Sequence, residues 1–235
     1  MIPQINYAVA VLEQPSTKKK LRFRPYVVKE ERILLMAKEN NSFLEVLRAV
    51  KQILQNCCLE RDFNASKITL FDLEYLFLKL RAVSVNNVVR FSSLDKEDNK
   101  NYKHAINLDD VKVLFPENMP SSKIEISKDL VIMMKYPTVD FIEDKELTTE
   151  NLEEMGIDSL LVNCMDKVFE KDRVLKLTES EKKELLDNLS IKSFDEMKEF
   201  LFAVPKIEYR VYWKNSLDKN KFWLFSSLKD FFLFL

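Results

Sequence analysis

Gly156 is the only glycine in this chain of 235 residues, whereas glycine makes up about 7% of an average protein. Phosphate-binding loops need several glycines, because the backbone must adopt positive φ and approach the anion closely. Neither a Walker sequence nor a dinucleotide-binding fingerprint can be written with a single glycine. The sequence therefore disfavours the nucleotide-binding folds that depend on these loops.

The histidine content limits the possible chemistry in the same direction. His104 is the only histidine, so a Ser-His-Asp or Cys-His relay would have to pass through it. We interpret His104, in the segment KHAIN, as an ordinary strand or loop residue rather than a catalytic one. We expect no enzyme, although a carboxylate-only enzyme stays an alternative that would need two facing acids in a cleft.

Cysteine usage and charge favour a soluble protein of a reducing compartment. Cys57, Cys58 and Cys164 form no C-x-x-C pair, so they predict neither a disulfide framework nor a zinc site. Cys57 and Cys58 are expected to lie in the packing face of a helix. The 37 Lys and Arg residues balance 38 Asp and Glu residues, which gives no net field toward nucleic acid or membrane. The start resembles no signal peptide and no apolar run approaches the roughly 18 residues of a membrane span, so we expect neither export nor membrane insertion.

Hydrophobic periodicity predicts an α+β fold with a helical core and β-hairpins near the N-terminus, in mid-chain and at the C-terminus. We expect a first region, 1–139, and a second, mainly helical region, 140–235. The first is predicted to contain strands at 4–12 and 21–26, helices at 28–40, 42–57 and 70–83, a hairpin of 88–91 with 103–108, a third strand at 111–115 and a hydrophobic strand at 124–136.

The segment 70–83 is apolar almost all round, so we expect it to be the central helix, buried on most of its circumference. Its charged residues are Asp72, Glu74, Lys79 and Arg81. Carboxylates at positions i and i+2 of a helix point apart, which disfavours an acid–base pair. We expect these charged residues to face water or to pair locally.

The second region is expected to be helical over 157–169 and to contain two further helices, which open with the capping boxes Thr178–Glu181 and Ser193–Glu196. It begins with an acidic segment, 140–154, interpreted as a solvated linker. A hairpin of 207–213 with 221–225 and a short final helix close the chain.

Two groups of residues are candidates for binding a partner. The C-terminal segment is so aromatic that it must be buried in its own domain or against a partner; its candidates are Phe222, Trp223, Phe225, Phe231, Phe232 and Phe234. The other group is a basic stripe with an interleaved aromatic residue, and it comprises Lys18, Lys19, Lys20, Arg22 and Arg24. This stripe is either the solvated edge of a hairpin or a nucleic-acid site.

Three sets of segments together resemble the baseplate hub assembly family of T-even-type contractile bacteriophages. They are RFRPYVVKEERILLMAKEN with AVKQILQNC and FDLEYLFLKLRAVSV, then INLDDVKV with LVIMMKYP, and finally PKIEYRV with LKDFF. The resemblance implies a hub structural subunit or assembly factor that binds other hub or tail proteins, without catalytic residue, small-molecule substrate or cofactor. It also implies a location in the host cytoplasm during assembly and in the virion tail baseplate.

Members of that family often carry C-x-x-C pairs in two hairpins, which suggests zinc knuckles. At the corresponding places this chain has Ser92, Ser93 and Asp95 in one hairpin and Trp213 and Ser216 in the other, so we predict no zinc. If the family's two pairs share one ion, the two loops should nevertheless be neighbours. Trp213 would then fill the space that the metal organises in relatives.

Overall fold

The computed structural model describes residues 6–40, 42–145 and 156–232, and its fold is α+β, as predicted. Its contacts divide the chain into two compact units. Unit 1 comprises residues 1–114 and 206–235, and unit 2 comprises 115–205. These bounds differ from the two regions expected from the sequence, which meet at residue 139, because the strand that follows unit 2 pairs with a strand that precedes it.

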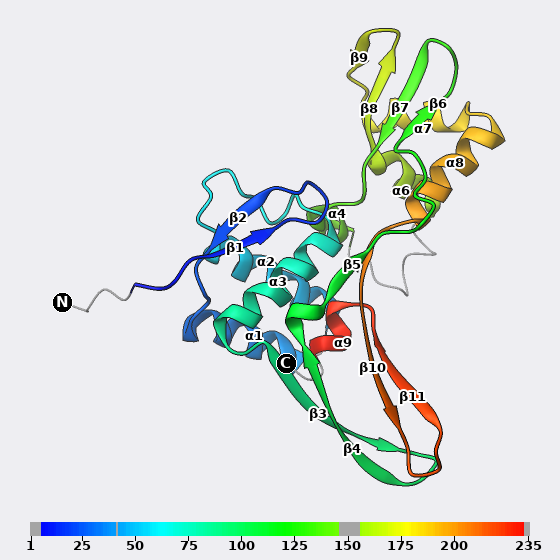
Figure 1. Ribbon diagram of the computed structural model, residues 1–235. Coiled ribbons are helices and arrows are strands. Elements are labelled where there is room, and N and C mark those ends of the chain that lie inside the picture. The colour runs from blue at the N-terminus through cyan, green and yellow to red at the C-terminus, as the bar shows by residue number, and fades with distance from the viewer. Residues whose placement is uncertain (1–5, 41, 146–155, 233–235) are drawn as a thin grey trace. The chain divides into compact units, whose positions relative to one another are not determined.

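Within the described residues, unit 1 combines four α-helices with three small antiparallel sheets, two of which are hairpins (Figure 1). Its elements in chain order are β1 (Ala10–Glu13), β2 (Lys20–Phe23), α1 (Val28–Asn40), α2 (Phe43–Cys57), α3 (Leu70–Ser84), β3 (Val88–Asp95), β4 (Lys100–Asn107), the 3₁₀ turn η1 (Leu108–Asp110), β5 (Lys112–Leu114), β10 (Lys206–Lys214), β11 (Asn220–Phe225) and α9 (Leu228–Phe232). Strands β1 and β2 pair, β3 pairs with β4, and the third sheet has the order β11-β10-β5.

Helix α3 is the centre of unit 1, as its pattern predicts. Leu73, Leu76 and Phe77 are fully buried, and α3 contacts α2, β1, η1, β5 and β10. The ring of Phe77 lies 6.0 Å from that of Phe232, so the C-terminal helix α9 covers part of α3. Burying a side chain of this size contributes about 2 kcal/mol of stability.

The expectation that the acidic residues of α3 face water or pair locally is wrong for Asp72 and Glu74, which are both buried. Asp72 accepts hydrogen bonds from the side chains of Gln14 (2.8 Å) and Ser16 (2.5 Å), which tie the β1–β2 turn to the helix. Glu74 accepts one from the backbone N–H of Leu228, at the start of α9 (2.9 Å). These three partners are all remote in sequence from α3, and because α3 is enclosed on several sides it has no solvent face at these positions.

Among the described residues, four hairpin turns contain a non-glycine residue with positive φ. They are Lys18 between β1 and β2, Asn99 between β3 and β4, Lys171 after β8 and Asp218 between β10 and β11. Tight hairpin turns need such a residue, and glycine supplies it with least strain. With one glycine in the chain, these turns use lysine, asparagine and aspartate, of which the last two adopt this conformation more readily.

The described part of unit 2 contains one four-stranded antiparallel sheet with the order β6-β7-β8-β9 and several helices. Its elements are β6 (Lys123–Glu125), β7 (Leu130–Met134), α4 (Val139–Asp144), α6 (Ile157–Cys164), β8 (Met165–Glu170), β9 (Arg173–Leu175), α7 (Glu179–Asp187) and α8 (Ile191–Phe202). Helix α6 contacts α7, α8 and β8. Within the described part of the chain, no helix of either unit is long and apolar enough to cross a membrane.

Three local predictions for unit 2 need correction. The helix expected over 157–169 ends at Cys164, because Val168 is paired in the sheet with both Ile132 and Leu175. The single strand expected over 124–136 is a hairpin of β6 and β7. Helix α8 begins after Ser190, whose hydroxyl caps it, so the second capping box is wrong, whereas the box at Thr178 is confirmed. The predicted acidic linker lies largely outside the described residues.

Candidate interaction site

The β3–β4 and β10–β11 hairpins of unit 1 meet at their tips (Figure 1). Asn215 donates a hydrogen bond from Nδ2 to Oδ2 of Asp95 (3.0 Å), and both side chains are buried. The amide oxygen of Asn215 also accepts from the backbone N–H groups of Leu217 and Lys219, which fixes its own turn. The prediction that the loops around Asp95 and Ser216 are neighbours is confirmed.

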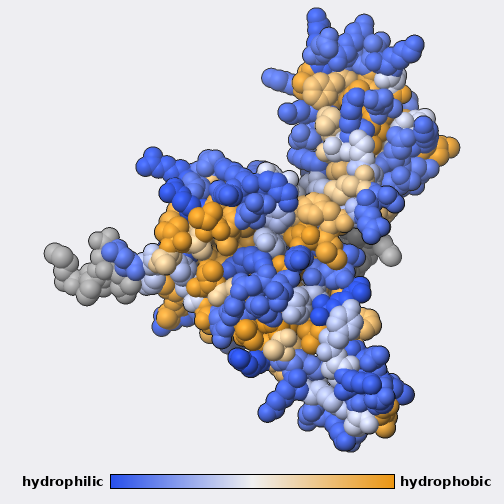
Figure 2. All heavy atoms as spheres, in the orientation of Figure 1, coloured by the Kyte–Doolittle hydropathy of each residue, from blue (hydrophilic) through white to orange (hydrophobic). Residues whose placement is uncertain are grey.

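A second group of polar contacts closes the outer part of the two turns. The backbone N–H and the hydroxyl of Ser216 donate to Oδ2 of Asp98 (3.0 and 2.9 Å), which also accepts from the hydroxyl of Tyr102. Burial alone would raise the pKa of Asp98, but these hydrogen bonds have the larger effect and lower its pKa well below the ordinary value. Glu97 binds the ammonium groups of Lys219 (2.7 Å) and Lys221 (2.5 Å). Hydrophilic residues cover most of the visible surface at these tips (Figure 2).

Aromatic rings fill the space behind the polar contacts. The ring of Trp213 lies 4.8 Å from that of His104 and 6.4 Å from that of Trp223. The hydroxyl of Ser93 is 2.8 Å from Nε2 of His104 and accepts a hydrogen bond from the indole N–H of Trp223 (3.3 Å). Burial lowers the pKa of His104, so the imidazole is neutral at pH 7 and serves as a packing residue of the two hairpins.

The residues at this junction do not fit a zinc site. Asp95 is the one charged oxygen ligand among the five positions that correspond to the family's cysteine pairs, and Asn215 already occupies its Oδ2. Zinc prefers four ligands drawn from thiolates, imidazoles and carboxylates. Within the described residues, no group of three or more such side chains is placed to hold a metal ion. Hydrogen bonds and ring packing join the hairpins instead, with Trp213 at the centre of the packing.

The outer face of the β10–β11 hairpin carries an exposed hydrophobic patch. Tyr212 and Phe222 are directly opposite in the register, with ring centroids 6.0 Å apart, and are 68% and 57% exposed. Leu224 lies two residues further on the same face and is 43% exposed. Arg210, opposite Leu224, places its guanidinium 5.9 Å from the Phe222 ring. We call Arg210, Tyr212, Phe222 and Leu224 the outer face of the hairpin.

The six aromatic candidates from the sequence divide between this surface and the core. Phe222 is on the outer face, and Trp223 is exposed on the opposite face of the strand. Phe225, Phe231 and Phe232 are buried within unit 1, where the rings of Phe225 and Phe231 are 5.0 Å apart. The protein itself covers these three rings, so they do not contribute to a partner surface in this conformation. Phe234 lies outside the described residues. Tyr212 and Leu224 were not predicted, and the alternation along β10 and β11 is the signal that identifies them.

The basic stripe of β1 and β2 is largely paired with acidic residues. Four of its cations lie near carboxylates: Lys18 with Glu13 (3.9 Å), Lys19 with Asp62 (2.7 Å), Arg22 with Glu60 (2.8 Å) and Arg24 with Glu30 (2.8 Å). Lys20 is exposed. This pairing weakens the positive potential that a phosphate backbone would meet, and it favours the interpretation of the stripe as a solvated hairpin edge.

The cysteines are packed as expected for small hydrophobic residues. Cys57 at the end of α2 and Cys164 at the end of α6 are fully buried. Burial raises the pKa of Cys57 to about 11 and that of Cys164 to about 12, which keeps both as unreactive thiols. Cys58 is half-buried just beyond α2, outside the helix in which we predicted it.

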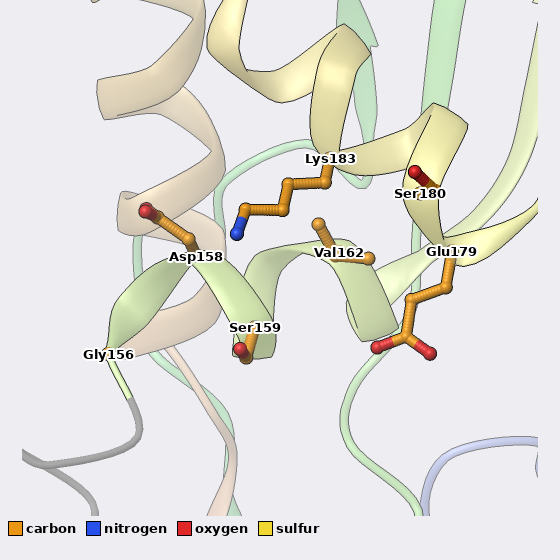
Figure 3. A pocket seen from close by; sticks show the side chains of 7 residues that line it. All are labelled: Gly156, Asp158, Ser159, Val162, Glu179, Ser180 and Lys183. Carbon is orange, nitrogen blue, oxygen red and sulfur yellow. The ribbon is translucent and has the colours of Figure 1, made fainter.

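Unit 2 contains a polar pocket of about 450 Å³ between α6 and α7 (Figure 3). It is lined by Gly156, Asp158, Ser159, Val162, Glu179, Ser180 and Lys183. Lys183 extends from α7 over α6 on the side of Asp158, while the Glu179 carboxylate lies at the other end of the pocket. No hydrogen bond or ion pair of the described residues joins two of these side chains, so the pocket holds no assembled nucleophile and base.

Comparison with known proteins identifies a single family for both units. The family described as T4 bacteriophage base plate protein matches residues 6–233, which is nearly the whole chain. No curated protein and no solved structure matches the chain. The match spans the two hairpins and the insertion of unit 2 between β5 and β10. The chain therefore belongs to the T4 bacteriophage base plate protein family.

Proposed function

We propose that this protein is a subunit or assembly factor of the baseplate hub, and that it acts by binding other hub or tail proteins through the outer face of the β10–β11 hairpin. Family membership supports a structural role in the baseplate. The observation that carries the choice of surface is the exposure of Tyr212, Phe222 and Leu224 side by side on one hairpin. Exposed apolar patches of this kind usually mark interaction sites. The proposal requires no cofactor.

The β10–β11 hairpin has a fixed conformation before a partner binds, because its other face is packed against the β3–β4 hairpin. The contacts of Asn215 with Asp95 and of Ser216 with Asp98 fix the tip, and the Trp213 ring fixes the inner face. A surface that keeps one conformation loses little entropy when a partner binds, so more of the interaction energy appears as affinity. Aromatic residues next to an arginine are also typical of the residues that dominate interface energetics.

The test uses a phage that lacks a working copy of this protein, with variants supplied in trans. Phe222→Asp places a charge in the middle of the outer face, and we expect baseplate formation, counted by electron microscopy of lysates, to fall at least about tenfold. Phe202→Asp in unit 2 is the matched control, because Phe202 is also highly exposed, at 73%, and we expect it to support normal baseplate numbers.

Two results would contradict the proposal. One is normal baseplate formation with Phe222→Asp, provided that the variant is folded by circular dichroism. The other is a purified wild-type protein that binds no baseplate or tail component. Mass spectrometry of finished tails then separates the two roles, because a structural subunit remains in the particle and an assembly factor leaves it.

A further inference from the structure

We infer that β11 is a docking strand, to which an extended segment of another tail protein, apolar at every second residue, adds as a further strand. This inference rests on the proposed function and specifies how the partner is recognised. It requires a free sheet edge, apolar side chains beside that edge and a fixed hairpin, and each of these is present in unit 1.

The edge of the sheet at β11 is open within the described residues. The strand order is β11-β10-β5, so β11 has a neighbour on one side alone. The backbone N–H of Asn215 bonds to the carbonyl of Lys219 (3.0 Å) in the register that continues along the hairpin. Because hydrogen-bonded and non-bonded pairs alternate in antiparallel strands, the backbone groups of Phe222 and Leu224 point away from β10.

The side chains of β11 suit an added strand. Phe222 and Leu224 lie on the outer face and Trp223 on the other, and all three are exposed. Among the described strands, β11 alone carries three successive exposed large hydrophobic residues. Proteins usually protect such an edge with a free lysine, but Lys221 of this strand is bound to Glu97. The edge is therefore apolar and unprotected where it is available for pairing.

The backbone geometry favours an extended partner over a helical one. A helix laid on the outer face would cover Phe222 and Leu224 and leave their outward N–H and carbonyl groups without partners, and burying an unpaired backbone group is unfavourable. An added strand pairs these groups and places alternate apolar side chains beside Tyr212, Phe222 and Leu224.

The decisive measurement is hydrogen–deuterium exchange of the amides of β11. It compares the purified protein with its complex, isolated from infected cells through an N-terminal affinity tag on this chain. We expect the Phe222 and Leu224 amides to exchange rapidly in the free protein and roughly a hundredfold or more slowly in the complex. The Trp223 amide, which already bonds to β10 by the same alternation, serves as an internal reference because it is protected in both.

Two substitutions at one position separate the backbone from the side chain. Leu224→Pro removes the outward N–H and leaves the bonds to β10, since proline is tolerated where an edge N–H faces outward. Leu224→Ala removes the side chain and keeps the N–H. We expect Leu224→Pro to weaken complex formation by roughly tenfold or more relative to Leu224→Ala.

Three outcomes would overturn the inference and can be told apart. If the complex forms but the Phe222 and Leu224 amides still exchange rapidly, strand addition is wrong and the proposed function stands. If these amides become protected in the pure protein as its concentration rises, the occupant is a second copy of this chain. If no tail protein is recovered with the tagged chain, the proposed function fails and the inference fails with it.

Discussion

The buried carboxyl group of Glu74 makes unit 1 sensitive to pH in a direction that a single substitution can isolate. Glu74 is 4% exposed, and its one hydrogen-bond donor among the described residues is the Leu228 N–H. Burial raises its pKa from 4.5 to about 7, with the hydrogen bond from Leu228 opposing and the charge of Asp230 adding to the rise. Glu74→Gln keeps an acceptor for Leu228 and removes the titrating proton.

The size of the effect follows from the difference between the folded and unfolded pKa values. The folded protein retains the proton up to about pH 7, whereas the unfolded chain loses it near pH 4.5. The stabilisation from the protonated form is therefore complete below pH 4.5 and is lost as the pH rises to 7, at about 1.4 kcal/mol per pH unit. The total loss is about 3 kcal/mol, which the glutamine variant does not suffer.

Urea unfolding followed by tryptophan fluorescence measures this difference. Both tryptophans of the chain, Trp213 and Trp223, are in unit 1, the unit that contains Glu74. We expect wild type and Glu74→Gln to have similar stabilities at pH 4.5 and the variant to be about 3 kcal/mol more stable at pH 8. A difference that stays constant with pH, or that grows toward low pH, would refute the assignment of a protonated carboxyl at this position.

Two other predictions concern the unit boundary and the hairpin turns. Replacing 115–205 by an Asn-Gly turn should leave unit 1 folded with native tryptophan fluorescence, because Leu114 and Lys206 are already paired strand residues. An unfolded product would show that unit 1 depends on unit 2. Lys171→Gly should stabilise unit 2 by about 0.5–1 kcal/mol in calorimetric unfolding, since it relieves a positive φ of 55°. Lys167→Gly within strand β8 is the control and should destabilise it.

The sequence predicts those elements whose information is local. The apolar circumference of α3 and the capping box at Thr178 predict the first residues of helices α3 and α7 to within one residue. Strand β8 is missed because Met165–Glu170 continues an apolar spacing that also suits a helix. The segment is a strand because it pairs with β7, where Val168 lies opposite Ile132. The burial of Asp72 and Glu74 is missed for the same reason, because their hydrogen-bond donors, Gln14 and Leu228, are far away in sequence.

The candidate site was predictable in outline but not in its contacts. Family resemblance correctly indicates that the two hairpin loops are neighbours, a relation that no spacing in this sequence reveals. The bond between Asp95 and Asn215 joins residues 120 positions apart and cannot be inferred from either hairpin. Aromatic content alone also fails to separate Phe222 on the surface from Phe225 in the core, because this distinction depends on which face of β11 packs inward.

The interruption of unit 1 by unit 2 has a consequence during translation. Residues up to 114 leave the ribosome well before β10, β11 and α9, yet Phe225, Phe231 and Phe232 complete their core. A nascent chain that stops early thus exposes the apolar side of α3 and lacks β10, β11 and α9 altogether. Prematurely terminated products should be recognised by chaperones and proteases rather than joined to a growing tail.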